Sequence, residues 1–220
     1  DAGVILVGVG AVEARALERA PHGLRWVAVG GARPAGGTPH AGVDNVAGAR
    51  MATRHLLELG HRTVHHVPGP PDWPEAHERW AGWHRTLTAA GRVVPPVVGA
   101  AWDAASGYRL GRRLAADPAV TAILCANDRV ALGVLRALHE AGRPAPDEVS
   151  VVGFDDTPEA AYFHPPLTTI RQDAGELGRR SLGMLLDHLA ASPHESVPAG
   201  LIVDSELVIR SSTGRHRDFP

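Results

Sequence analysis

The chain has 220 residues, a formal net charge of -2 and 44% hydrophobic residues, which is enough for one sizeable core or two small lobes. One cysteine excludes an internal disulfide scaffold. The 22 Lys+Arg against 24 Asp+Glu exclude a polybasic nucleic-acid arm. No run reaches the roughly 20 apolar residues of a membrane span, and no basic segment precedes the apolar start, so we expect no signal peptide.

Short apolar runs alternate with helical patterns along the chain. The runs predicted to be strands are 4–9, 24–29, 63–67, 97–101, 121–126, 149–154, 168–171 and 206–210. Most of them are continuously apolar rather than alternating, which is typical of strands in a parallel sheet with helices on both faces.

The helical patterns fall between these runs and carry recognisable end signals. The predicted helices are 45–59, 74–90, 104–116, 127–141 and 173–190. Pro74 suits a first helical turn, Gly60 and Gly91 suit helix ends, and Asp173 with Glu176 forms a variant of the capping box. The repeated strand–helix order predicts a doubly wound α/β fold. Segments 33–42 and 192–200 are expected to be loops, and 211–220 a frayed tail.

Polar and aromatic side chains follow several predicted strands directly. They are Trp102 and Asp103, Asn127 and Asp128, Asp155 and Asp156, and Gln172, with Arg79 on the helix that follows another strand. Ligands of open α/β sheets bind outside the carboxyl ends of the strands. Carboxylate, guanidinium and amide groups can pair with hydroxyl groups, and a Trp face can cover the apolar side of a pyranose. The set therefore favours a neutral polyol or sugar as ligand.

Each of these residues also has a purely structural interpretation. Asn127 can cap a helix, Asp155 and Asp156 can form a turn, Trp102 can belong to a core and Arg79 can be a solvated charge. We expect no metal site at His65-His66, because no partners stand at ligand spacing. The sequence has no Gly-x-Ser-x-Gly, P-loop or dinucleotide fingerprint. It therefore predicts neither an enzyme nor a cofactor.

Six motifs, in order over residues 43 to 213, resemble those of the LacI family of transcriptional regulators. They are Asp44-Asn45-Val46-Ala47-Gly48-Ala49, Arg79-Trp80-Ala81-Gly82-Trp83, Ala126-Asn127-Asp128 with Ala131-Leu132-Gly133, Val149-Ser150-Val151-Val152-Gly153-Phe154-Asp155-Asp156, Pro165-Pro166-Leu167-Thr168-Thr169-Ile170 with Gln172, and Leu207-Val208-Ile209-Arg210-Ser211-Ser212-Thr213. The resemblance implies a fold like that of periplasmic sugar-binding proteins, with two α/β lobes and an effector in the cleft between them.

The resemblance also implies a function and its site. It implies a cytoplasmic, dimeric repressor whose sugar-like effector changes its affinity for operator DNA, a coupling between two sites. Effector-binding positions of the family match Arg79, Asn127, Asp155 and Gln172, and Trp102 matches an aromatic residue that stacks on sugar in some members. Asp44 and Asn45 match the first crossover between the lobes.

The same resemblance divides the chain. Residues 1–43 with 173–200 would form the N-terminal lobe, 44–172 with 201–210 the C-terminal lobe, and 211–220 a tail. The three crossings are expected near 43–44, at Gln172 and near 201–203. The family's opening βαβα units and its DNA-binding helix-turn-helix have no counterpart in this sequence, so the N-terminal lobe is expected to be incomplete.

Two other functions fit the residues. A solute-binding protein of a sugar ABC transporter shares the fold and the Asn-Asp motif, and the residues upstream of Asp1 would distinguish it. An enzyme on the same scaffold could use Asp155 or Asp156 as a base, but no nucleophile–base pair supports that function.

Overall fold

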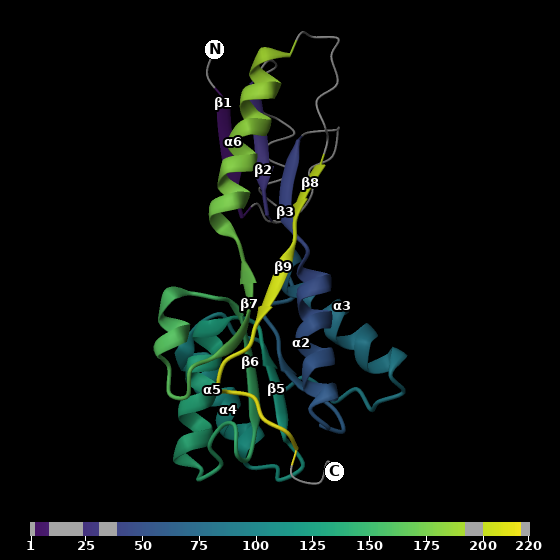
Figure 1. Ribbon diagram of the computed structural model, residues 1–220, viewed down its shortest axis with the longest axis vertical. Helices are drawn as coiled ribbons and strands as arrows, with labels where there is room; N and C mark the ends of the chain where they lie inside the picture. The colour runs from purple at the N-terminus through teal and green to yellow at the C-terminus, as the bar shows by residue number, and fades with distance from the viewer. Residues whose placement is uncertain (1–2, 9–23, 31–38, 192–199, 217–220) are drawn as a thin grey trace. The chain divides into compact units, whose positions relative to one another are not determined.

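The computed structural model describes residues 3–8, 24–30, 39–191 and 200–216. The described residues form two parallel or largely parallel sheets with flanking helices (Figure 1), so the predicted α/β fold is confirmed. The chain divides into two compact units. The first unit is Asp1–Asp44, Asp72–Glu75 and Asp173–Asp204, and the second unit is Asn45–Pro71, Ala76–Gln172 and Ser205–Pro220. In the described ranges, no helix is long and apolar enough to cross a membrane.

The first unit contains a parallel sheet whose strand order is β1-β2-β3-β8 in its described part. Its strands are β1 (Gly3–Val7), β2 (Arg25–Val29), β3 (His40–Val43) and β8 (Gly200–Val203). Helix α6 (Ala174–Ala190) packs against this sheet through Met184 and Leu185. The side chain of Asp173 caps α6 by accepting the Glu176 N–H at 2.7 Å, as the capping pattern predicts.

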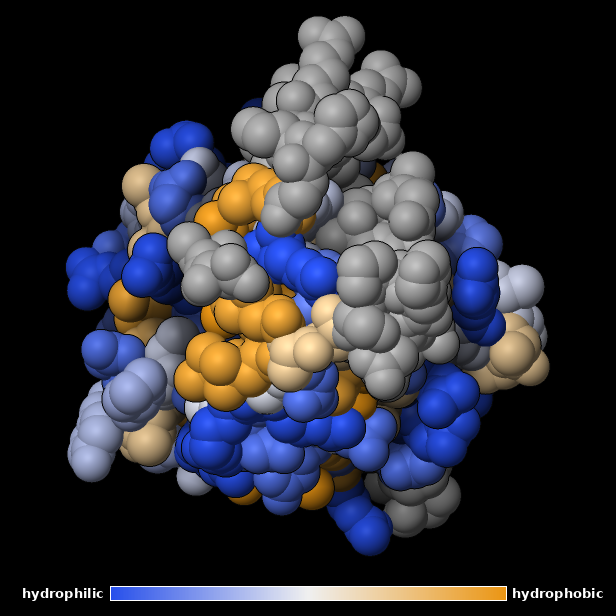
Figure 2. All heavy atoms as spheres, turned by 90° about the horizontal axis from the view of Figure 1, so that it is seen from above, coloured by the Kyte–Doolittle hydropathy of each residue, from blue (hydrophilic) through white to orange (hydrophobic). Residues whose placement is uncertain are grey.

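Apolar side chains remain exposed on the described part of the first unit. The large ones are Ile5, Val7, Leu24, Trp73, Leu182, Leu186 and Ile202. In the view of Figure 2, apolar residues gather near the middle of the face that is drawn.

The second unit is built on a sheet with the order β4-β5-β6-β7-β9. The strands are β4 (His65–Val67), β5 (Ala122–Cys125), β6 (Ser150–Asp155), β7 (Thr168–Gln172) and β9 (Ser205–Val208). Strands β4 to β7 are parallel, and β9 pairs antiparallel with β7. The helices of this unit are α2 (Asn45–Glu58), α3 (Pro74–Ala89), α4 (Ala104–Ala115) and α5 (Asp128–Glu140), with a 3₁₀ helix at Pro158–Tyr162.

Helices cover both faces of this second sheet, and a hydrophobic core lies on each face. One core packs α4 and α5 on the sheet through residues such as Leu110, Val134 and Leu138. The other packs α2 and α3 through Leu56 and Trp83. This double burial explains why the strands are apolar on successive residues.

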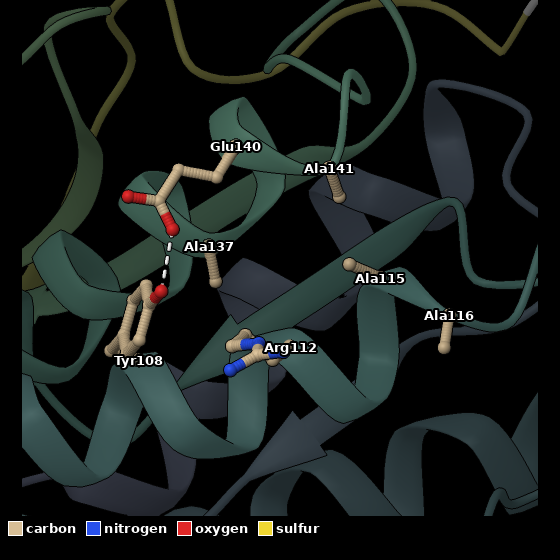
Figure 3. A pocket seen from close by; sticks show the side chains of 7 residues that line it. All are labelled: Tyr108, Arg112, Ala115, Ala116, Ala137, Glu140 and Ala141. Atoms are coloured by element: carbon tan, nitrogen blue, oxygen red, sulfur yellow. Dashed lines mark hydrogen bonds between the residues drawn. The ribbon is translucent and has the colours of Figure 1, made fainter.

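Glycines bring α4 and α5 into close contact. A Cβ at Gly133 would lie 2.0 Å from the carbonyl oxygen of Ala104, which no side chain permits. At the other end of the pair, the Tyr108 hydroxyl donates to Glu140 Oε2 at 2.5 Å (Figure 3). Both residues line a hollow of about 490 Å³, whose lining residues are Tyr108, Arg112, Ala115, Ala116, Ala137, Glu140 and Ala141.

Two predicted assignments differ from the structure. Residues 97–101 form no strand. Strand β3 begins at His40, inside the segment 33–42 that was expected to be a loop, whereas strand β8 begins at Gly200, the last residue of the expected loop 192–200. Residues 33–38 and 192–199 of these two expected loops lie outside the described residues. Strands β3 and β8 are each four residues long, and the two pair with each other, so they gain their hydrogen bonds from a partner about 160 residues away rather than from local pattern.

The unit boundaries also differ from the predicted ones. Because β8 pairs with β3, residues 201–203 belong to the first unit, and the last crossing lies between Asp204 and Ser205. Residues 72–75 also group with the first unit. The expected frayed tail is wrong for its described part, since Ser212 is buried and its hydroxyl donates to Val151 O at 2.6 Å.

Candidate functional site

The carboxyl ends of β4 to β7 meet at one edge of the second unit's sheet, because these strands run parallel. We call the side chains gathered there the rim: Asn45, Arg79, Trp102, Asn127, Asp155 and Gln172. Asn45 begins α2, Arg79 lies in the second turn of α3, and the other four follow or end strand and loop segments. Five of these residues were predicted as effector-binding, and Asn45 as a crossover residue.

Arg79 is the most buried charged member of the rim, with 6% of its surface exposed. Its Nε–H donates to Asn45 Oδ1 at 2.9 Å, and an Nη1–H donates to Ala126 O at 2.5 Å. Its Nη2 lies 3.3 Å from Asp155 Oδ1. The guanidinium carbon stands 3.8 Å from the centroid of the Phe154 ring, a cation–π arrangement. The guanidinium therefore ties α2, α3, β5 and β6 together, and it is not the solvated charge that the structural interpretation predicted.

Asp155 adopts a backbone conformation that L-residues rarely take, with φ +104°. Such strain costs on the order of 1–3 kcal/mol and clusters at functional positions. Its carboxylate faces Arg79 and accepts a hydrogen bond from Gln172 Nε2 at 2.8 Å. Burial raises the pKa of Asp155, and the Arg79 charge opposes this rise. The carboxylate is thus held at the rim between two donors.

Trp102 and Asn127 are joined at the edge of the rim. Asn127 caps α5 by accepting the Val130 N–H at 2.8 Å, and its Nδ2 donates to Trp102 O at 3.2 Å. The Trp102 ring packs so closely on Gly69 that a Cβ there would lie 2.6 Å from the ring. The ring centroid is 5.9 Å from the Arg79 guanidinium carbon. The capping interpretation of Asn127 is confirmed, and Trp102 is a packed, half-buried ring beside the polar groups.

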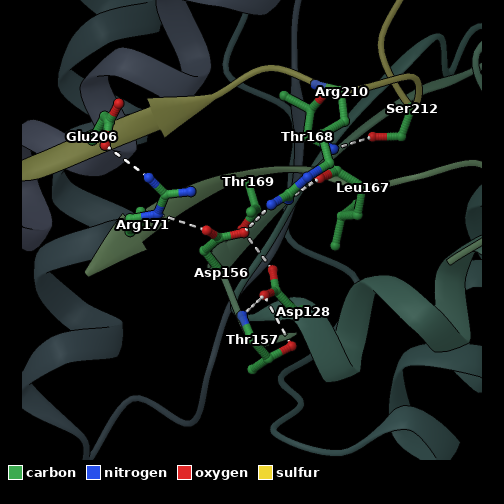
Figure 4. A network of polar contacts seen from close by, with 10 residues as sticks. All are labelled: Asp128, Asp156, Thr157, Leu167, Thr168, Thr169, Arg171, Glu206, Arg210 and Ser212. Carbon is green, nitrogen blue, oxygen red and sulfur yellow. Dashed lines mark hydrogen bonds and ion pairs between the residues drawn. The ribbon is translucent and has the colours of Figure 1, made fainter. Parts of the chain in front are cut away.

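A network of charges lies behind the rim and joins β7 to the end of the chain (Figure 4). Asp156 accepts from Arg171 Nε at 2.7 Å and from Arg210 Nη2 at 2.6 Å. Arg171 also contacts Glu206 on β9 at 3.2 Å, and Arg210 donates to Leu167 O at 2.7 Å. Strands β7 and β9 both lead out of the second unit, so these pairs anchor the two connections at their base.

Asp128 was predicted to follow a strand but was not predicted to be an effector-binding residue. It is fully buried and accepts from the Thr169 hydroxyl at 2.6 Å and from the Thr157 N–H at 2.8 Å (Figure 4). Burial raises the pKa of Asp128 to about 6, although these hydrogen bonds oppose the rise. A Cβ at Gly153 would lie 2.2 Å from its carboxylate. Gly153, which lies against this carboxylate, is the sequence signal that could have identified Asp128.

Most of the chain matches a known family. Residues 53–213 match the family described as periplasmic binding protein-like domain. The chain is 39% identical over 164 residues to the lactose operon repressor of Klebsiella pneumoniae, covering 73% of this chain and 46% of that protein. It is 34% identical over 173 residues to the regulator CelR of Thermobifida fusca, covering 77% and 50%.

Solved structures that resemble this chain come from the same kind of protein as these relatives. The lac repressor dimer bound to operator and the anti-inducer ONPF superposes with a TM-score of 0.83 at 30% identity, covering 96% of this chain and 73% of that one. The chain belongs to the LacI family. The CelR–cellobiose complex superposes with a TM-score of 0.85 at 32% identity, covering 96% and 65%. The chain spans about half the length of the curated relatives it matches.

Family membership bears on the three functions that the residues allowed. The relatives named above are transcriptional regulators rather than transporter components or enzymes. The family resemblance read from the motifs is therefore confirmed. The effector-binding roles of the rim residues stay predictions, as does the hinge role of Asp44 and Asn45, between which the chain passes from the first unit to the second.

The chemistry of the rim is that of hydrogen bonding rather than of metal binding or covalent catalysis. It presents a guanidinium, a carboxylate, three carboxamides and an indole ring within one edge of the sheet. In the described ranges, no group of His, Cys, Asp and Glu is arranged to hold a metal ion. Cys125 is buried, and burial raises the pKa of its thiol, so it is a packing residue rather than a nucleophile.

Proposed function

We propose that the chain is the effector-binding region of a LacI-family transcriptional repressor. A sugar-like effector binds at the rim and changes the affinity of a DNA-binding domain, outside this chain, for its operator. The repressor acts in the cytoplasm, where its DNA lies. The observation that carries the proposal is the rim itself, where Arg79, Asp155 and Gln172 are linked in one chain of hydrogen bonds beside Trp102.

The rim supports a polyhydroxyl ligand for two reasons. Charged donors and acceptors that are already oriented by their neighbours bind vicinal hydroxyls without a large ordering cost. An indole ring next to them offers an apolar face for the C–H side of a sugar. The complex of CelR with cellobiose shows that a relative of this chain binds a sugar.

The proposal is tested on the full-length protein with operator-like DNA. Sequences would be selected from random palindromic duplexes, and binding measured by fluorescence anisotropy with and without a panel of sugars. We expect selective binding to the enriched duplexes and at least a fivefold change in affinity with one sugar, because allosteric couplings are typically about 1–3 kcal/mol. The absence of sequence-specific binding in every ligand state would refute the proposal.

We also propose that two copies associate through the outer face of α4 and α5. Leu132 on α5 is 44% exposed. Leu132 lines a shallow hollow together with Ala104, Ala105, Tyr108, Arg109, Gly133 and Arg136. The lac repressor is a dimer in its solved structure, so a second copy is the occupant that we expect on this apolar face.

Leu132→Glu is expected to convert the dimer to monomer, raising the dimer dissociation constant at least 100-fold. The reason is that association would bury an unpaired carboxylate. Analytical ultracentrifugation over a range of concentrations measures the change. Val93→Glu, at a side chain that is 76% exposed in the same unit, is the matched control and should leave the dimer intact. An unchanged dimer in Leu132→Glu would place the interface elsewhere.

A further inference from the structure

A groove between α2 and α3 combines positive charge with apolar walls. It has a volume of about 470 Å³, and its lining residues are Val46, Arg50, Arg54, Leu57, Gly82, Arg85, Thr86, Ala89 and Ala90. Gly82 allows the two helices to meet at its end, since a Cβ there would lie 2.4 Å from Val46 O. Figure 1 shows α2 and α3 beside each other in the second unit. None of the rim residues lines this groove.

Three arginines line the groove without an acidic partner. Arg50, Arg54 and Arg85 are exposed, and within the described residues none of them makes an ion pair. No Asp or Glu belongs to the lining. Glu58 stands four residues after Arg54 on α2 but does not pair with it. The groove therefore carries concentrated positive charge that the described protein does not neutralise.

The placement of these charges is unfavourable for the helix alone. Arg50 and Arg54 are four residues apart on α2, so they lie on the same face one turn apart and repel each other. Arg85 approaches the same hollow from α3. An arrangement that costs stability and has no internal partner is what an anion-binding site requires.

The chemistry of the groove indicates the class of ligand. Guanidinium groups donate paired hydrogen bonds that match the oxygens of a phosphate group. The apolar walls, with Val46, Leu57 and Ala89, can contact a carbon skeleton. A hollow of about 470 Å³ lies within the range of roughly 300–1,000 Å³ that small-molecule sites occupy. A phosphorylated metabolite fits both the charge and the size.

We propose that the groove between α2 and α3 is a second ligand site, which binds a phosphorylated small molecule through Arg50, Arg54 and Arg85. The site is separate from the rim, so a regulator of this design would read a neutral sugar at one place and a phosphorylated metabolite at another. Binding in the groove would stiffen the contact between α2 and α3. Both helices carry rim residues, Asn45 at the start of α2 and Arg79 on α3, so the two sites are mechanically connected.

The test uses the full-length protein with inorganic pyrophosphate as a minimal probe and with glucose 6-phosphate against glucose. Isothermal titration calorimetry is done at low ionic strength on the wild type, on Arg50→Gln/Arg54→Gln/Arg85→Gln and on a control with the same charge change, Arg62→Gln/Arg112→Gln/Arg215→Gln. We expect the groove variant to bind pyrophosphate and glucose 6-phosphate at least tenfold more weakly than the wild type. The control should stay within twofold.

Circular dichroism checks the fold, and the groove variant should melt at or above the wild-type temperature because like-charge repulsion is removed. Equal binding of pyrophosphate by the wild type and the groove variant would overturn the proposal, as would an equal loss in the control, which would show binding to net charge alone. No binding to the wild type would overturn it too. These outcomes do not depend on operator binding, so they leave the regulatory function a separate question.

Discussion

Arg79→Ala is expected to weaken effector binding at least 100-fold. The guanidinium positions Asp155 and Asn45 directly, and hydrogen bonds of charged groups contribute about 1.5–3 kcal/mol each. Under the proposed function the effector accepts hydrogen bonds from this guanidinium, and the loss of two such bonds corresponds to two or more powers of ten in affinity. The measurement is calorimetric titration with the sugar that most raises the melting temperature of the wild type in a screen.

The same substitution should also lower the stability of the fold, because the Arg79 side chain joins α2, α3, β5 and β6. Its removal leaves Ala126 O, Asn45 Oδ1 and the Asp155 carboxylate without their cation. We expect a loss on the order of 1–3 kcal/mol. Titrations are therefore done below the melting temperature of the variant. Arg179→Ala, which breaks an exposed pair with Glu176 at 2.9 Å, is the matched control and should change neither property measurably.

Two more variants distinguish a direct contact between Arg79 and the effector from a general loss of stability. Arg79→Lys retains the positive charge near Asp155 but cannot reproduce the forked donor geometry, so it should fold well and still bind effector weakly. Gln172→Ala removes one donor from Asp155 and should give a smaller loss of affinity. Wild-type affinity in a folded Arg79→Ala protein would remove Arg79 from the effector site.

The sequence predicts most of the second unit well because its signals there are local. The helix ends predicted at Gly60 and Gly91 lie within two residues of the observed ends, and φ is positive at both glycines. Strands β5 and β6 follow from continuous apolar runs, since both faces of their sheet are covered. Position after a strand was sufficient to bring Asn127, Asp155 and Gln172 to one edge.

The parts that escaped prediction depend on distant partners. β3 and β8 are four-residue strands that gain regularity only by pairing with each other. The local sequence predicts Arg79 to be an exposed charge on a helix surface, but the Phe154 ring and the carbonyl of Ala126 bury it. Asp128 reads as an exposed first-turn residue of α5, yet Thr157 and Thr169 surround it.

Acid is expected to destabilise the second unit through His66, which lies on β4 in its core. The ring is 2% exposed, its Nδ1 lies 2.9 Å from Leu124 O, and it packs 5.3 Å from the Trp83 ring. The pKa of His66 is lowered from 6.5 to about 4, chiefly by desolvation on burial; the hydrogen bond to Leu124 O opposes this shift, and the positive charge of Arg79 adds to it. The folded state therefore holds the ring neutral.

The sign of the effect follows from proton linkage. Between pH 6.5 and about 4 the unfolded chain binds a proton at His66 that the folded state does not, so stability is full above pH 6.5 and is lost as the pH falls through this window. The shift corresponds to about 3 kcal/mol. His61 adds a second group of the same kind, because burial and the nearby His216 lower its pKa to about 4 as well.

His66→Asn isolates this contribution, because an Asn amide can still donate to Leu124 O but does not titrate. The variant will be less stable at pH 7, since it loses the packing of the ring on Trp83. Its difference in unfolding free energy between pH 7 and pH 4, measured by urea titration, should nevertheless be smaller than that of the wild type by about 3 kcal/mol. His139→Asn, at an exposed position on α5, has no burial cost to relieve and should keep the wild-type difference. A His66→Asn protein with an unchanged pH dependence would show that the buried ring does not control acid sensitivity, and would shift that role to His61.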